Sequence, residues 1–544
     1  LCKNRQKTDN SAGEQFFIVS LRLIMRRFFL AYIVLCIFGV AHTFAQQALS
    51  RNSRDQYGNQ IDPSTQPNSL KNDSTEVQSL PPKLYMWRLS ETLGNRTIIP
   101  ADTAYHHFQN TNLVEGITGH YNYLGNLGSP RLSRIFFERD NGNYSSIFME
   151  PYSSFFLRPD QVNFTNSNIP YSNLSYYKAG DKVNGEERFK SYFSVNANKR
   201  MAFGFNIDYL YGRGYYASQS TAHFNGGVFA SYIGDRYQMQ GVFNTFNLKM
   251  NENGGIADDQ YITRPENMAD GKKQYESTTI PVKFDPAKAT NRNNDYYVYL
   301  THRYRLGFKR NSQAIDEQKK DTVETEEFVP VTSFIHTLKV EGTKHSYRAN
   351  SEDKGFYENS YFNKNLASRD STRAFSMKNV FGIALLEGFN KYAKAGLTAY
   401  ISHKYSRYQL MDTLQRKTET DSVKTTRYSE QEVFIGGELA KRQGNFLHYN
   451  VIGEVGLLDK ALGQFRLNGN MDVNFRLWKD TVTLIGRASI TNTLPSFYMR
   501  HYHSNHYFWD NDNMEKEFRS RIEGELNIER WGTNLRAGVE NIKN

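Results

Sequence analysis

One segment of the chain, residues 464–477, alternates between apolar and polar side chains without interruption. One face carries Phe465, Leu467, Gly469, Met471, Val473, Phe475 and Leu477, and the other carries Gln464, Arg466, Asn468, Asn470, Asp472, Asn474 and Arg476. A period of two is typical of a β-strand whose faces meet different environments. Strands in globular proteins usually have about 5 or 6 residues. A strand roughly 14 residues long therefore requires an extended apolar surrounding on one side and water on the other.

The same alternation recurs along the chain. Residues 200–211, 297–309 and 394–401 show it clearly, and in the first of these Met201, Phe203 and Phe205 share the apolar face. Weaker strands are predicted near residues 171–179, 186–197, 221–233, 236–249, 330–345, 374–388, 429–441, 446–458, 481–492, 517–530 and 533–542. Counted from Tyr171, the pattern predicts about fifteen strands.

The connections between these strands alternate between short and long. Tight turns are predicted at 198–199, 234–235, 389–390, 479–480 and 531–532, and polar loops at 213–220, 250–294, 346–373, 406–428 and 493–516. This alternation is expected for antiparallel strands that cross a membrane, with short periplasmic turns and long external loops. A soluble β-sandwich gives no reason for it. Two connections break the rhythm, because 310–329 is long and 459–463 is short.

The fold predicted is all-β, a transmembrane antiparallel up-and-down β-barrel. Bacterial barrels normally have an even number of strands with both termini in the periplasm. Here the count is odd, the last strand ends on the side of the long loops, and no aromatic residue closes it. We therefore expect about 16–18 strands in the complete protein, with the C-terminal strands missing from this chain.

The N-terminal part of the chain predicts export. Met25, Arg26 and Arg27 precede an apolar stretch at 28–40 and the small residue Ala45, as in a signal peptide at 25–45. Residues 1–24 precede this signal and are interpreted as an upstream extension. Residues 46–82 are polar, rich in Ser, Asn and Pro, and are interpreted as a disordered periplasmic lead. The barrel is then expected over 83–544.

Composition supports strands rather than membrane helices. Hydrophobic residues make up 39% of the chain, and mean hydropathy is −0.67. No apolar run after the signal is long enough for a membrane helix. The chain has 36 Tyr and 37 Phe but only 4 Trp, which suits amphipathic strands. The net charge of +11 is interpreted as lumen and loop charge, because nucleic acid is an implausible partner for an exported protein.

Several segments resemble a known family. These are residues 123–130 (Tyr-Leu-Gly-Asn-Leu-Gly-Ser-Pro), 150–152, 164–176 and 502–509 (Tyr-His-Ser-Asn-His-Tyr-Phe-Trp). On these segments the chain resembles the outer-membrane porins of Bacteroidetes over most of 83–544. The resemblance implies a single-chain β-barrel in the cell outer membrane and supports the fold more firmly than transport. It brings no catalytic residues.

The alternation also predicts which side chains meet lipid and which meet the lumen. Lipid-facing residues are predicted to be Phe203, Phe205, Phe465, Leu467, Met471, Val473, Phe475 and Leu477. Lumen-facing, pore-lining residues are predicted to be Arg200, Asp208, Arg303, Arg305, Arg466, Asn468, Asn470, Asp472, Asn474 and Arg476. A water-filled lumen lined with charge is a conductance path whose charged rings set its selectivity.

No metal, cofactor or enzymatic activity is predicted. His501, His503 and His506 lie in one loop with Asp510 and Asp512, and His-x-His on a strand can chelate a metal. A Tyr- and His-rich external loop needs no ligand, however, and no cysteine supports a soft site. Serines and histidines are scattered, without a nucleophile and base in one constellation.

The function predicted is porin-like passive diffusion of small solutes. The main alternative is a structural or secretion-associated barrel that is plugged by its loops, such as 251–294, or by a partner. A TonB-dependent transporter would need an N-terminal plug, for which 46–116 is too short and too polar, and an exported sandwich is the third alternative. Expected partners are outer-membrane lipid, small solutes or ions and the barrel-assembly machinery. The sequence does not identify the solute, and it does not decide whether the protein forms a homo-oligomer.

Overall fold

The computed structural model of the protein describes residues 84–101, 120–139, 144, 146–268, 276–284, 289–316, 321–350, 356–362, 367–390, 392–412, 424–477 and 480–543. The predicted upstream extension (1–24), signal peptide (25–45) and periplasmic lead (46–82) lie outside the described residues. Of the helices formed by described residues, none is both long and apolar enough to cross a membrane.

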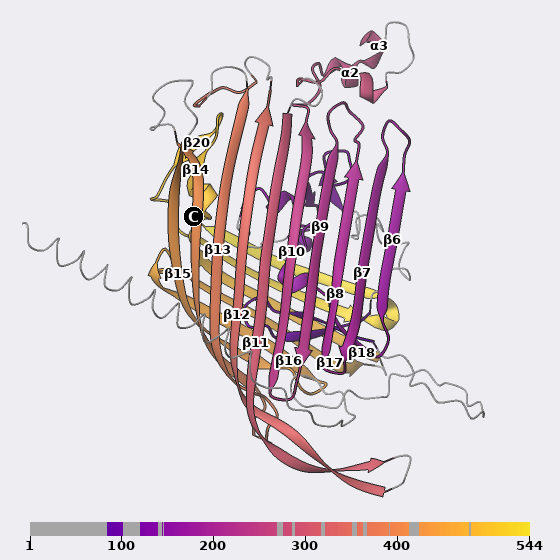
Figure 1. The fold of residues 1–544 in the computed structure, drawn as a ribbon, viewed down its shortest axis with the longest axis vertical. Helices are drawn as coiled ribbons and strands as arrows, with labels where there is room; N and C mark the ends of the chain where they lie inside the picture. Colours follow the sequence, from indigo (N-terminus) through magenta and orange to yellow (C-terminus); the bar gives the residue numbers. More distant parts are fainter. Residues whose placement is uncertain are drawn as a thin grey trace, which may run out of the picture. The chain divides into compact units, whose positions relative to one another are not determined.

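One large antiparallel sheet dominates the fold (Figure 1). Its 15 strands are hydrogen-bonded in chain order, so each strand pairs with the one before it and the one after it. They are β6 (Tyr171–Ala179), β7 (Glu186–Asn198), β8 (Met201–Gly212), β9 (Thr221–Ile233), β10 (Tyr237–Glu252), β11 (Ala289–Asp316), β12 (Asp321–Ala349), β13 (Ser368–Leu385), β14 (Gly396–Asp412), β15 (Lys424–Lys441), β16 (Leu447–Asp459), β17 (Phe465–Leu477), β18 (Asp480–Thr493), β21 (Glu517–Ile528) and β22 (Thr533–Lys543). In Figure 1 the strands from β16 onward pass behind β6–β12, so the sheet curves back across its inner face.

The predicted fold class is confirmed, as is the count of fifteen strands from Tyr171. The segment with unbroken alternation, 464–477, forms β17, and residues 200–211 form β8. Most of the connection 310–329 is not a loop, because β11 continues to Asp316, β12 begins at Asp321, and the two strands pair there as a hairpin. Beyond Leu306 a register shift occurs, and from there these two strands pair only with each other. Figure 1 shows the hairpin extending past the ends of the neighbouring strands.

The two faces of the sheet differ as the alternation requires. On β8, Met201, Phe203 and Phe205 are exposed on one face, while Ala202 and Gly204 are buried on the other. On β10 the exposed Phe243 opposes a face on which polar side chains are buried, namely Gln238, Gln240 and Asn244. Buried polar groups need hydrogen-bond partners. We call this polar side the inner face of the sheet.

Smaller elements precede the large sheet in the chain. A three-stranded sheet comprises β1 (Leu84–Leu89), β2 (Arg96–Ile99) and β5 (Phe164–Ser167), and a hairpin comprises β3 (Tyr121–Tyr123) and β4 (Arg131–Ser133). The described residues here also form the 3-10 turns η3 (Phe136–Glu138), η4 (Glu150–Tyr152) and η5 (Pro159–Gln161). We call the described part of residues 84–167 the inner segment.

Two connections of the large sheet contain structure of their own. Between β10 and β11 lie α2 (Gln260–Thr263), α3 (Pro265–Met268) and η6 (Ser277–Thr279), and no residue of α2 or α3 is buried. Between β18 and β21 lie α4 (Phe497–Arg500), β19 (His501–His503) and β20 (Phe508–Asp510). The last turn contains η7 (Glu529–Trp531). We call residues 494–516 the inward loop, because the side chains of 497–506, apart from that of Met499, are buried, several of them against the inner face, as described below.

Candidate functional site

The inner segment packs on the inner face of β8–β11. The shared core is aromatic and aliphatic: the inner segment contributes Trp87, Leu89, Leu127, Met149, Tyr152, Phe155, Phe156, Val162 and Phe164, and the sheet contributes Leu210, Phe229, Val242, Phe246, Leu248, Met250, Tyr297 and Tyr299. Two tyrosines of β11 also bond to its backbone: the Tyr297 hydroxyl donates to the Leu157 carbonyl at 2.8 Å, and the Tyr299 hydroxyl to that of Ser90 at 3.1 Å. Burying so many apolar side chains between the inner segment and the sheet stabilises the contact between them.

The inner segment also touches the far end of the sheet. The guanidinium of Arg521 on β21 lies over the Phe136 ring at 4.4 Å, and that of Arg536 on β22 lies over the Phe137 ring at 5.1 Å. Cation–π contacts of this geometry stabilise by about 0.5–1 kcal/mol each at exposed sites. The inner segment therefore contacts both β8–β11 and β21–β22, and lies within the curve of the sheet.

The turn between β1 and β2, residues 90–95, is inserted deepest into the wall, and we call it the anchoring turn. Leu93 is 1% exposed and packs with Val380 of β13 and Tyr400 of β14. Gly94 has a φ of +61°, and a Cβ added there would collide with the side chain of Thr301 on β11. Both the backbone conformation and the close approach therefore require glycine.

Polar contacts complete the hold on the anchoring turn. Arg303 Nη2 donates to the Leu93 carbonyl at 3.2 Å and to Asn95 Oδ1 at 2.6 Å. The Asn95 amide donates in turn to Glu438 Oε2 of β15 at 2.8 Å. These bonds are largely buried, so breaking one leaves an unsatisfied group that costs about 1–3 kcal/mol. The turn thus links β11 to β15 across the inner face.

Glu91 adds an ion pair, with its carboxylate 3.2 Å from Lys339 Nζ on β12. Burial alone would raise the pKa of Glu91, but the ammonium groups of Lys339 and Lys378 outweigh burial and hold this pKa below its ordinary value. A carboxyl with a lowered folded-state pKa stabilises the fold above its unfolded pKa. That contribution is lost as the pH falls through the lowered value.

The inward loop packs against β13–β15. Phe497 stacks on Tyr408 of β14 with ring centroids 3.8 Å apart, and Tyr498 and Tyr502 are buried beside them. Phe148 of the inner segment packs on the same cluster, 5.6 Å from the Tyr498 ring. The inward loop thus meets the inner segment at Phe148, and so does Asn293, whose amide donates to the Phe148 carbonyl at 3.1 Å. Closure by residues 251–294 stays a prediction.

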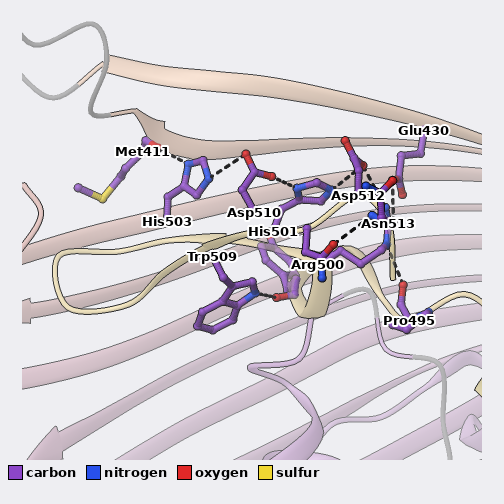
Figure 2. Close-up of polar contacts among 12 residues, drawn as sticks. Met411, Glu430, Pro495, Arg500, His501, His503, Trp509, Asp510, Asp512 and Asn513 are labelled. Carbon is purple, nitrogen blue, oxygen red and sulfur yellow. Dashed lines mark hydrogen bonds and ion pairs between the residues drawn. The ribbon is translucent and has the colours of Figure 1, made fainter. Parts of the chain in front are cut away.

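Figure 2 shows the polar contacts of the inward loop. Arg500 is 2% exposed, and its Nη2 lies 2.7 Å from Glu430 Oε1. His501 is bonded to Asp510 through Nδ1 and to Asp512 through Nε2, the latter at 3.1 Å. His503 Nδ1 donates to the Met411 carbonyl at 2.8 Å. These contacts hold the loop to the end of β14 and to β15.

Two observations bear on metal binding at this loop. The pKa of Asp512 lies below its ordinary value because Lys460 and His501 lower it, although partial burial alone would raise it. The carboxylate of Asp512 is therefore already paired with these two residues. Within the described part of the chain, no three His, Cys, Asp or Glu side chains are placed to hold a metal ion together. The loop histidines serve as hydrogen-bonding groups.

We expect Arg500→Met to loosen the inward loop. Removing one partner of a buried ion pair typically costs about 3–5 kcal/mol, because the other charge is left buried. Limited proteolysis of the folded protein should therefore cut within 494–516 faster than in the wild type. Lys460→Met is the matched control, since its pair with Asp512, at 3.4 Å, is exposed and contributes little. Equal cleavage in both variants would contradict a holding role for Arg500.

The residues predicted to face lipid lie on the outer face of the sheet. Those with exposed side chains are Phe203, Phe205, Leu467, Met471, Phe475 and Leu477, whereas Phe465 and Val473 are half-buried. All eight alternate with residues of the inner face along β8 and β17. Contact with lipid itself stays a prediction.

The residues predicted to line the lumen differ among themselves. Arg200 precedes β8 and forms an exposed ion pair with Asp235 of the next turn. Asp208 pairs with the buried Arg188 at 2.6 Å. Arg303 holds the anchoring turn, and Arg305 donates to the Gly234 carbonyl at 2.9 Å. The structure therefore uses these four in the wall or its internal contacts, and their role as pore lining stays a prediction.

The predicted residues of β17 are more open. Arg466 pairs with Glu454 at 2.7 Å, and Asp472 lies 2.7 Å from His448 Nδ1 and accepts from the Asn474 amide at 3.0 Å. Three others are exposed and share this face, namely Asn468, Asn470 and Arg476. Their polar groups are therefore accessible on the inner face of β17.

Sequence reasoning missed the anchoring turn altogether. Gly94-Asn95 is a turn signal that could have marked it. Nothing in the sequence, however, indicated that Glu91 and Leu93 would meet strands more than two hundred residues further along the chain.

A curved antiparallel sheet with an apolar outer face and a polar, partly filled inner face defines a porin-like β-barrel protein. The chain belongs to the family described as "Putative porin", which it matches over residues 83–544. The predicted resemblance to an outer-membrane porin family is thereby confirmed, while the assignment to Bacteroidetes stays a prediction. No curated protein matches the chain.

Solved structures show more distant similarity. A variant of the ferric enterobactin receptor PfeA from Pseudomonas aeruginosa has 12% identity and a TM-score of 0.40, covering 68% of this chain and 52% of that one. The RagAB peptide importer has 8% identity and a TM-score of 0.37, covering 63% and 42%. The siderophore receptor PirA from Acinetobacter baumannii has 7% identity and a TM-score of 0.27, covering 69% and 62%. The chain spans about half the length of the first of these.

Proposed function

We propose that this protein is an outer-membrane channel through which small solutes diffuse passively, beside an inner segment that narrows the passage. The outer face supplies an apolar surface for lipid, as β-barrels of the outer membrane do. Membership of the porin family supports a transport protein rather than an enzyme. The predicted signal peptide agrees with an outer-membrane location.

The observation that carries this proposal is the uneven filling of the inner face. On β10 the inner-face residue Asn244 is buried, and its amide donates to the Leu157 carbonyl of the inner segment at 3.5 Å. Val242 and Phe246 of the same face pack in the core shared with the inner segment. On β17 the corresponding residues Asn468 and Asn470 are exposed. The polar, accessible inner face of β17 offers water and hydrated solutes a route that the β8–β11 side does not.

Cysteine accessibility tests this route. The two cysteines of the chain, Cys2 and Cys36, both precede the end of the predicted signal peptide, so a cysteine introduced into the sheet of the processed protein reports on one position. We expect a charged, membrane-impermeant thiol reagent to reduce the single-channel conductance of Asn470→Cys, because the adduct would obstruct the passage. Met471→Cys is the matched control, since the neighbouring side chain is exposed on the outer face. A wild-type protein without stable conductance in planar bilayers, or equal effects in both variants, would refute the proposed passage.

A second candidate is a barrel that is plugged at rest and serves a structural or secretion-associated role. The anchoring turn favours it, because Leu93 and its polar neighbours hold the inner segment across several strands. Absence of wild-type conductance together with conductance after release of this turn would support the plugged barrel over the open channel.

A further inference from the structure

Three lysines face one another directly across neighbouring strands of the inner face. Lys339 of β12 is the register partner of Lys378 on β13, and Lys378 is the register partner of Lys404 on β14. Side chains in such positions have Cβ atoms about 4.5–5.5 Å apart, and like charges there are destabilising. A row of three ammonium groups therefore needs negative charge nearby.

The wall provides carboxylates for the two outer lysines. Lys339 lies 3.3 Å from Glu341, and Lys404 lies 3.4 Å from Glu432. The next carboxylate along the wall, Glu454, is taken by Arg466 at 2.7 Å. With these groups paired, the wall leaves the central lysine, Lys378, as the cation without an ion pair to another described residue.

The stronger of the two negative charges that act on Lys378 comes from the inner segment, since Glu454 of β16, which is paired with Arg466, acts on it less than Glu91 does. Glu91 of the anchoring turn acts on Lys378 electrostatically and pairs with Lys339 at 3.2 Å. Its side chain is 34% exposed, and those of Lys339 and Lys404 are 17% and 28% exposed. Arg158 of the inner segment and Asp295 of β11 also act on this group of charges. Glu91 is thus a tethered carboxylate placed at the edge of a partly accessible lysine row.

We propose that Lys339, Lys378 and Lys404 form a binding site for small carboxylate anions, and that Glu91 occupies part of it when no solute is bound. The proposal rests on the proposed function, for which it names the class of solute. Rows of lysine in a pore favour anions, and a lysine without an ion pair in the wall gains most from an incoming carboxylate. Binding of such an anion competes with Glu91 for Lys339 and Lys378.

Binding of succinate to the refolded full-length chain in detergent tests the site without requiring conductance. We expect Lys378→Gln to weaken succinate binding roughly tenfold or more, since hydrogen bonds to charged groups are lost. Glu91→Gln should strengthen it by a similar factor, because the tethered competitor is gone. Lys249→Gln is the matched control, since Lys249 is exposed on β10 outside the row. Unchanged affinity in both the Lys378 and Glu91 variants would overturn the proposal.

Bilayer recordings then separate the site from the channel. In a potassium succinate gradient, the reversal potential of Lys378→Gln should shift toward cation preference relative to wild type and Lys249→Gln. A wild-type protein that binds succinate as predicted but does not conduct would refute passive diffusion and leave the site intact. If the protein conducts, but Lys378→Gln changes neither its reversal potential nor its affinity for succinate, the site is refuted and the channel is not.

Discussion

Gly94→Val is expected to release the anchoring turn and to raise the single-channel conductance. A β-branched residue at a φ of +61° is strained, and its Cβ would collide with Thr301. The left-handed conformation alone costs about 1–2 kcal/mol for a residue other than glycine. The collision adds to this cost, so the turn must leave its place between β11 and β15. Planar-bilayer recordings measure the opening, and limited proteolysis of the folded protein reports whether residues 84–167 become accessible.

Gly532→Val provides the control for backbone strain. Gly532 has a φ of +57°, but a Cβ added there meets nothing within 4 Å. The two substitutions therefore impose the same conformational penalty, and only Gly94→Val adds the collision. If both variants conduct like wild type and resist proteolysis equally, the turn does not anchor the inner segment. If both variants raise the conductance equally, backbone strain alone is sufficient to open the channel, and the explanation by a collision with Thr301 is wrong.

The second large effect is expected at the outer face of β17. Met471 is 45% exposed there, and arginine at the midplane of a membrane barrel costs about 2–4 kcal/mol. Met471→Arg should therefore reduce the fraction of protein that assembles in membranes, measured by heat-modifiable migration on gels. Asn470→Arg is the matched control, because it adds the same charge on the exposed inner face one residue away.

Asp472→Asn completes this comparison. It should leave assembly intact and alter at most ion preference, because Asp472 is half-exposed and its contacts with His448 and Asn474 are polar. If Met471→Arg and Asp472→Asn were equally harmless to assembly, the assignment of lipid and water to the two faces of β17 would be wrong.

The wall was predictable because its information is local. Alternation along 464–477 and 200–211 locates β17 and β8 within one residue at each end. Each strand has apolar side chains on the face toward lipid and polar side chains on the face toward water, so its own sequence is enough to identify it. The hairpin through 310–329 was missed because a charged segment can pair as a strand where no apolar face is required. Pattern alone does not separate such a strand from a loop.

The interior was not predictable for the opposite reason. The alternation places Arg303 on the inner face. Its hydrogen bonds to Leu93 and Asn95, however, join residues that are 210 and 208 positions apart in the sequence. The lysine row depends on register, and a slip of one residue would turn Lys378 to the outer face. Short polar segments such as 90–95 carry no periodicity from which such placement could be inferred.

The anchoring turn has a consequence for how the protein responds to heat. Connections between neighbouring strands range from the 2 residues between β7 and β8 to the 36 between β10 and β11, whereas 75 residues separate Asn95 from the start of β6. Closing the longest of these loops costs about 0.6–3 kcal/mol more in chain entropy than closing a connection between strands. That cost grows with temperature, and the hydrogen bonds between neighbouring strands all close shorter loops. On warming, the inner segment is therefore the first part to lose its place, and the chain passes through a state in which the sheet persists around an emptied interior.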